Sequence, residues 1–114
     1  MSHTDYFVIE SRDRKLLRSA LNEVLNGFAL DHFETAIGIG RSELQQVFKY
    51  LSELSDDAKA GLTRAHLTAA HNALREALRE LGIEEFQTRT GFEFQEAEMI
   101  LKKLSDLLGE APTA

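Results

Sequence analysis

The sequence predicts an all-α fold made of two copies of a helical unit, and three observations carry that prediction. The 114 residues include one proline and seven glycines, so helix breakers are sparse. Several segments repeat their apolar residues at spacings of three and four, which is typical of amphipathic helices with one buried face. The chain also aligns with itself at an offset of 53 residues, which indicates an internal duplication.

The first half of the chain is expected to contain two long helices. One begins at Ser11 and runs to about Phe28, with Asn26-Gly27 as a stop signal. The other spans about Arg41–Leu54 and stacks its apolar residues on one side. Ahead of both, Tyr6–Ile9 is the only convincing strand candidate, because aromatic and β-branched residues favour extended backbone. We therefore expect one short N-terminal strand beside the helices.

The second half is expected to contain a matching pair of helices. The polar segment Ser55–Ala60 is predicted to be a linker or short turn. Thr63 is predicted to cap a helix that ends at Gly82. A last helix is expected over about Glu93–Leu108, again with its apolar residues on one side.

The internal repeat is the most informative pattern in the sequence. Ser19–Leu54 aligns with Asn72–Leu107 without a gap, and 12 of the 36 aligned positions are identical. Shared helical periodicity explains matching apolar positions, but it does not explain an aligned Phe-x-Thr-x-x-Gly, which begins at Phe33 and at Phe86. The alternative is two amphipathic hairpins that resemble each other without common origin; we favour the duplication.

A chain of this length has room for one domain. Residues 1–114 are therefore expected to form a single domain of two repeats, at approximately 6–57 and 58–109, with flexible ends at 1–4 and 110–114. A helical unit of about 50 residues buries too little apolar surface to be secure alone, so the two repeats should share one core.

The segments around Phe33 and Phe86 fit two local structures. Apolar residues three and four positions apart suit a short helix closed by Gly38 in the first repeat and by Gly91 in the second. The residues from Phe33 to Ile39 also alternate, however, which suits a short strand. We favour the short helix and leave the strand open.

Composition excludes several functional classes. The sequence has nineteen acidic and thirteen basic residues, which give a formal charge of −6, and it has no cysteine. A disulfide scaffold, a thiolate zinc site and a cysteine nucleophile are therefore excluded. We find no secretory signal and no apolar run near the roughly 18 residues needed to span a bilayer. These features predict a cytoplasmic protein with no membrane partner.

No constellation of catalytic residues stands out. The sequence lacks a recognisable set of acid, base and nucleophile, so we expect neither an enzyme nor a bound cofactor or metal. His66 and His71 are five residues apart, which places them on different sides of a helix and not in the i, i+4 pair of a helical metal site. His71 falls on the apolar face and is expected to be a partly buried, hydrogen-bonded residue.

The segment His32–Leu51 resembles a helix-turn-helix motif, with Gly38 at the turn and apolar residues after it. The position four residues before the turn departs from that pattern, because Glu34 stands where close packing favours Ala or Gly. This resemblance implies an alternative function, a diverged nucleic-acid-binding regulator. Its candidate nucleic-acid face comprises Arg41, Ser42, Gln45, Gln46 and Lys49. Because the net charge of −6 opposes a polyanion, we do not expect nucleic acid as a partner.

The function favoured by the sequence is a small, non-catalytic protein-interaction or regulatory module. It has more large apolar residues outside the helical stripes than a monomer of this size readily buries. One interpretation is that these residues complete the shared core; the alternative is an interface with a protein partner or with the chain itself, in a two-fold homodimer. The candidate interface comprises Tyr6, Phe7, Val8, Ile9, Phe92 and Phe94.

Acidic residues cluster between Glu84 and Glu98. A solvated helix face explains such a cluster, and a basic partner is the functional alternative.

Overall fold

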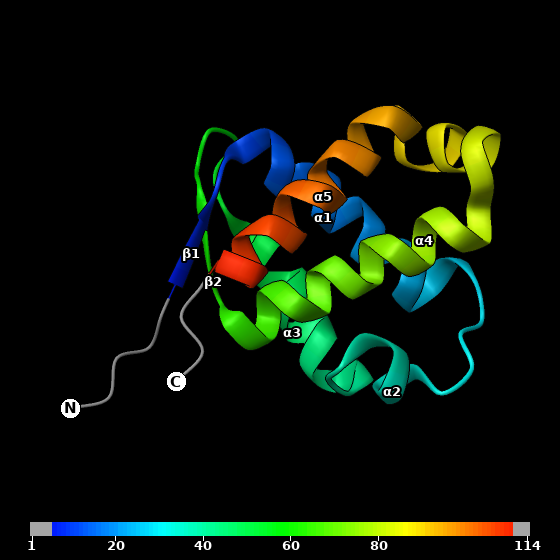
Figure 1. Cartoon of the computed structure of the whole chain (residues 1–114), viewed down its shortest axis with the longest axis horizontal. Coiled ribbons are helices and arrows are strands. Elements are labelled where there is room, and N and C mark those ends of the chain that lie inside the picture. Colours follow the sequence, from blue (N-terminus) through cyan, green and yellow to red (C-terminus); the bar gives the residue numbers. More distant parts are fainter. Residues whose placement is uncertain (1–5, 111–114) are drawn as a thin grey trace.

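The computed structural model describes residues 6–110 and is mostly helical, at 75%, with one small two-stranded sheet (Figure 1). The flexible ends expected at 1–4 and 110–114 lie outside these residues, apart from Glu110. In chain order the elements are β1 (Tyr6–Ile9), α1 (Ser11–Asn22), the π-helical turn η1 (Glu23–Gly27), α2 (Phe33–Ile37), α3 (Arg41–Glu53), β2 (Ala60–Thr63), α4 (Arg64–Thr90) and α5 (Phe94–Glu110).

The centre of the molecule is formed by α1 and α4, which pack against each other through their apolar faces. Leu17 and Leu21 of α1 and Leu67 and Leu74 of α4 are completely buried, as their spacing on one helical face requires. The other helices cover this central pair: α3 packs on α1, whereas α2 and α5 pack on α4 (Figure 1). One continuous core results, with buried residues from every helix.

The sheet contains a strand that was not expected from the sequence. The predicted strand Tyr6–Ile9 is confirmed as β1, but it pairs antiparallel with β2, at the end of the segment predicted to be a linker. Phe7 lies opposite Leu62 and Ile9 opposite Ala60, with their side chains turned toward the helices. The prediction of an all-α fold is therefore wrong in this one respect.

Both segments with two candidate structures are helical. Phe33 begins α2, and Phe86 lies in the last part of α4, so the strand alternative is wrong. Gly38 and Gly91 end these helices with φ angles of 104° and 78°, in the left-handed region that glycine adopts without strain. The helix expected to end at Gly82 is interrupted there, because Gly82 has non-helical backbone angles (φ 71°, ψ −176°), and it continues in a new direction.

A buried arginine holds the connection between α3 and β2 in place. Arg14 projects from the first turn of α1, is 3% exposed, and has its guanidinium surrounded by backbone oxygens. It donates hydrogen bonds of 2.9–3.0 Å to the carbonyls of Leu51, Ser55, Asp56 and Ala58. Since the last carbonyls of a helix lack partners within the helix, Arg14 both caps α3 and fixes the loop that leads into β2.

Candidate interaction surfaces

The predicted interface residues of β1 are divided between two faces of the sheet. Tyr6 and Val8 point outward and are each 64% exposed, whereas Ile9 is buried in the core. Phe7 is partly buried, and the guanidinium of Arg64 lies 5.7 Å from the centre of its ring. The alternation follows from the period of two along a strand. Only Tyr6 and Val8 of this strand are therefore available to a partner.

A shallow groove of about 240 Å³, lined in part by Tyr6, lies between the sheet and α3. One wall is Tyr50, whose hydroxyl accepts a hydrogen bond of 3.0 Å from the backbone N–H of Gly61. Tyr50 is itself among the exposed large side chains. The groove is lined by Tyr6, Gln46, Val47, Tyr50, Gly61, Leu62, Thr63 and His66.

The hydrogen bond from Gly61 also reveals the orientation of the strand edges. Because the Gly61 N–H points to Tyr50, it points away from β1, so Gly61 and the opposing Val8 form a non-hydrogen-bonded pair. The N–H and C=O of Val8 must then also point away from β2. Within residues 6–110, β1 has β2 as its only strand partner. The outer edge of β1 is thus a row of backbone groups without a paired strand.

The other two predicted interface residues pack at the edge of the core. The Phe94 ring meets the fully buried Phe86 edge to face, with 6.1 Å between ring centres. Phe92 lies under the guanidinium of Arg12, which is 5.3 Å from its ring centre. Both are partly buried. Phe94 also lines a second groove, of about 390 Å³, between the last part of α4 and the start of α5.

The candidate nucleic-acid face lies on α3, and all five of its members are exposed: Arg41, Ser42, Gln45, Gln46 and Lys49. The guanidinium of Arg41 nevertheless contacts its own chain. It donates a 2.8 Å hydrogen bond to the carbonyl of Leu25 and lies 4.5 Å from the ring centre of Phe33.

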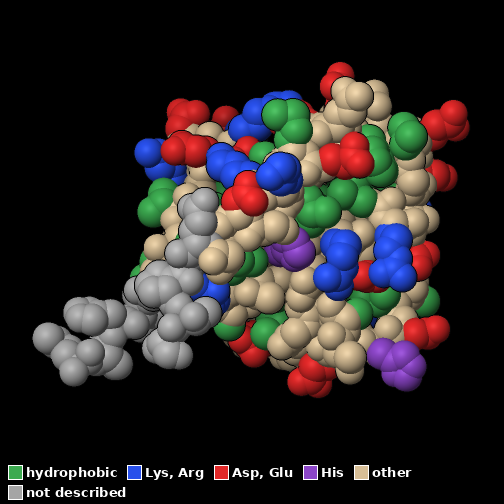
Figure 2. All heavy atoms as spheres, in the orientation of Figure 1, with side chains coloured by type: hydrophobic (Ala, Val, Ile, Leu, Met, Phe, Trp, Pro, Cys, Tyr) green, Lys and Arg blue, Asp and Glu red, His purple; other side chains and the backbone are tan. Residues whose placement is uncertain are grey.

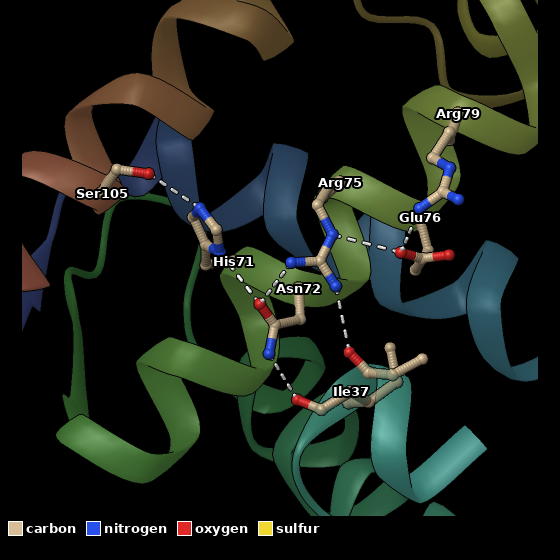
Figure 3. A network of polar contacts seen from close by, with 8 residues as sticks. Ile37, His71, Asn72, Arg75, Glu76, Arg79 and Ser105 are labelled. Carbon is tan, nitrogen blue, oxygen red and sulfur yellow. Dashed lines mark hydrogen bonds and ion pairs between the residues drawn. The ribbon is translucent and has the colours of Figure 1, made fainter. Parts of the chain in front are cut away.

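A chain of polar contacts crosses α4 (Figure 3). His71 is partly buried and hydrogen-bonded, as predicted: its Nε2 lies 2.8 Å from the Ser105 Oγ and its Nδ1 3.1 Å from the Asn72 Oδ1. Asn72 and Arg75 donate in turn to the carbonyls that end α2. The contacts thereby fasten α5, α4 and α2 to one another. The part played by Asn72 and Arg75 was not foreseen, because no motif marks a side chain that caps a distant helix.

The order of Ser105, His71 and Asn72 is that of a nucleophile, a base and an orienting amide. Acyl transfer also needs backbone N–H donors beside the nucleophile, and Ser105 lies within α5, where those groups bond to carbonyls of the same helix. A similar contact occurs elsewhere in the fold, where Arg18 Nε donates to Ser52 Oγ at 2.9 Å. These contacts are those of helix packing.

Comparisons of the chain with models of known protein families, with curated proteins and with solved structures found no significant match. In the part of the chain that the structure describes, no helix is long and apolar enough to cross a membrane. Among the same residues, no three His, Asp or Glu side chains are grouped to hold a metal ion.

Proposed function

We propose that the chain is a tandem duplication of one β–α–α–α unit, and that the resulting domain is a small, non-catalytic protein-interaction module. The duplication is supported by bonds that recur at the offset of 53 residues. Gly38 N–H donates to the Glu34 carbonyl at 2.8 Å, and Gly91 N–H donates to the Gln87 carbonyl at 2.9 Å. The Arg18–Ser52 contact likewise corresponds to the His71–Ser105 contact.

Contacts between the two halves involve one pair of aligned glutamates, Glu43 and Glu96, and partners that are one position out of alignment. Glu43 of α3 lies 2.9 Å from His66 in the first turn of α4, and Glu96 of α5 lies 2.6 Å from Arg12 in the first turn of α1. Each of these aligned glutamates thus reaches the long helix of the opposite half. An approximate two-fold axis between the halves accounts for this reciprocal pattern, and a shared core follows from it.

The interaction surface that we propose is the outer face and free edge of β1. The observation that carries it is the coincidence of two large, mostly exposed side chains, Tyr6 and Val8, with a strand edge that has no partner strand among the described residues. Unpaired strand edges recruit further strands, and large apolar side chains beside them add affinity. The partner that fits this edge is a second copy of β1.

The edge is self-complementary under a two-fold axis. Val8 turns its backbone groups outward, and in a strand the residue two positions away, Tyr6, does the same. An antiparallel pair of β1 strands centred on Phe7 therefore sets Tyr6 of each copy opposite Val8 of the other, with backbone hydrogen bonds in both directions. Two sheets of two strands become one sheet of four strands, and the outward side chains meet on one face.

The experiment is light scattering during size-exclusion chromatography at about 50 µM protein, a concentration well above the Kd of a micromolar dimer. We expect twice the chain mass of 12.8 kDa. Val8→Lys should give the monomer, since a charge at this position opposes edge-to-edge pairing. Met99→Lys replaces another strongly exposed apolar side chain, away from β1, and should remain dimeric. A monomeric native protein, or a monomer formed equally by both variants, would refute the β1 interface.

The alternative, a nucleic-acid-binding regulator, has weaker support. All five polar residues of this face are exposed on α3, but Arg41, the arginine suited to base edges, is engaged by Leu25 and Phe33. We expect no salt-sensitive binding when a labelled DNA duplex is titrated with the protein. Tight binding that is lost in Lys49→Ala would reverse the order of the two proposals.

A further inference from the structure

The groove between the last part of α4 and the start of α5 combines an apolar floor with an acidic rim. It has a volume of about 390 Å³, and more than half of its surface is apolar. Ile83 lies on the α4 side and is 66% exposed, directly after the break at Gly82. Phe94 lies on the α5 side. Figure 2 shows hydrophobic side chains at the surface of this part of the molecule, in its upper right, among acidic ones.

The carboxylates of this rim are not neutralised within the described structure. Glu93 and Glu98 line the groove and are exposed, and neither forms an ion pair with another residue between 6 and 110. The two arginines of the region form their ion pairs with other carboxylates: Arg89 Nε lies 2.9 Å from Glu23 Oε1, and Arg12 Nε lies 2.6 Å from Glu96 Oε2, with the charge of Glu93 acting on Arg12 as well. The groove therefore carries a local negative potential over an apolar floor.

We propose that this groove binds a basic segment of a partner protein, one that inserts a large apolar side chain between Ile83 and Phe94 and places lysines or arginines against the rim. Apolar anchoring with surrounding charge is a common way to recognise a peptide, and the charges set the association rate and its salt dependence. The size of the groove suits one or two side chains. An acidic protein surface repels nucleic acid and anionic lipid, so a cationic peptide is the occupant that the charges favour.

The probe is the capped peptide Lys-Lys-Leu-Phe-Lys-Lys, titrated into the isotope-labelled full chain and followed by amide chemical shifts. We expect shifts centred on residues 83–98, with a Kd of about 0.1–1 mM, the range of a few apolar and ionic contacts. Raising the salt from about 50 to about 300 mM should weaken binding, because exposed ion pairs are screened. Ile83→Ser should weaken it about tenfold through lost apolar contact.

A matched pair of charge variants makes the test specific. Glu93→Gln with Glu98→Gln should weaken binding about fivefold, whereas Glu53→Gln with Asp57→Asn, which removes the same charge from exposed residues of another surface, should change it less than about twofold. The proposal is overturned if both double variants act alike, if Lys-Lys-Ser-Ser-Lys-Lys binds equally well, if the shifts lie elsewhere, or if no binding occurs up to about 2 mM. The β1 interface is tested separately, by the mass that light scattering gives, so neither result depends on the other.

Discussion

The two halves of the chain, residues 6–53 and 60–110, each begin with a strand that is followed by helices, but they expose different side chains. The first half has α1, η1, α2 and α3, and the second has α4, which is interrupted at Gly82, and α5. Two contacts at aligned positions are alike. Arg41 lies over the ring of Phe33, and in the second half Phe94 packs against Phe86, eight residues before it. At an aligned pair of surface positions the side chains differ. The exposed Gln46 of the first half corresponds to Met99, which is 73% exposed. The matched positions thus share an aromatic contact, whereas the exposed side chains of the two halves differ.

The two strands show the same divergence at one hydrogen bond. Tyr50 covers the edge of β2 by accepting from the Gly61 N–H. The residue at the corresponding position in the second half is Lys103, and its Nζ lies 2.9 Å from Asp13 and not over β1. The edge of β2 is therefore covered at Gly61, whereas the outer edge of β1 has no partner strand among residues 6–110. This difference directs the proposed self-association to β1 and leaves β2 as the outer strand on each side of the four-stranded sheet.

The largest expected difference between the halves is at the paired phenylalanines. Phe86 is completely buried, so Phe86→Ala should lower the free energy of unfolding by about 3–5 kcal/mol. Phe33 is only partly buried beneath Arg41, so Phe33→Ala should cost about 1–3 kcal/mol. Urea unfolding followed by circular dichroism measures both. Equal losses would mean that the two sites are equally packed, contrary to the structure.

The next largest difference in stability is expected between Arg14 and Arg64, which donate to the last carbonyls of α3 and α5. Arg14 satisfies four buried or partly buried carbonyls, so Arg14→Met should cost about 2–4 kcal/mol and loosen the loop before β2. Among residues 6–110, Arg64 donates only to the Leu108 carbonyl, and Arg64→Met should cost about 1 kcal/mol. Amide exchange of residues 55–60 gives a separate readout. A larger effect at Arg64, or protected loop amides in Arg14→Met, would contradict the assignment.

How far the sequence predicts the fold depends on how local each signal is. The helices, the Thr63 cap and the two turn glycines follow from patterns of a few residues, and the structure confirms them. The strand β2 is missed because only Thr63 of its four residues is β-branched, and alanine and glycine are disfavoured in strands. An offset of 53 applied to Tyr6–Ile9 would have pointed to it, since it leads to residues 59–62.

The candidate sites were harder to predict, because they depend on segments that are distant in sequence. Tyr6 and Val8 were identified from their surplus of apolar surface, but so were Phe7 and Ile9, which the helices cover. Alternation along a strand separates its side chains into two faces, but the sequence alone does not tell which of these faces the helices cover. The hydrogen bonds of Arg14 join it to residues 37 to 44 positions away in the sequence, and no local pattern encodes such a contact.

Smaller effects are expected at the two matching serines. Ser105 bonds to the partly buried His71, so Ser105→Ala should cost about 1 kcal/mol. Ser52 bonds to the exposed Arg18, which water can satisfy instead, so Ser52→Ala should cost less than about 0.5 kcal/mol. Both changes add the same helix propensity, although Ser52→Ala also removes the hydrogen bond from Ser52 Oγ to the Phe48 carbonyl of its own helix. Thermal unfolding of both variants side by side tests it, and a greater loss in Ser52→Ala would reject the comparison.

The smallest expected effect belongs to an ion pair that only the first half has. Lys15 Nζ lies 2.9 Å from Asp56 Oδ1 and, through that hydrogen bond, holds the pKa of Asp56 below its ordinary value of 3.8. At the corresponding position the second half has Gly109. A carboxyl with a lowered pKa stabilises the fold above its unfolded pKa and loses that contribution as the pH falls through the folded pKa. Asp56→Asn should therefore lower the Tm slightly at neutral pH, by less than about 2 °C, because both side chains are solvated. The difference from the native protein should shrink as the pH falls below about 4.

Asp57→Asn is the control for Asp56→Asn, since Asp57 forms no ion pair with another residue between 6 and 110. A difference that stays constant down to pH of about 2, or one that Asp57→Asn reproduces, would remove Lys15 as its cause.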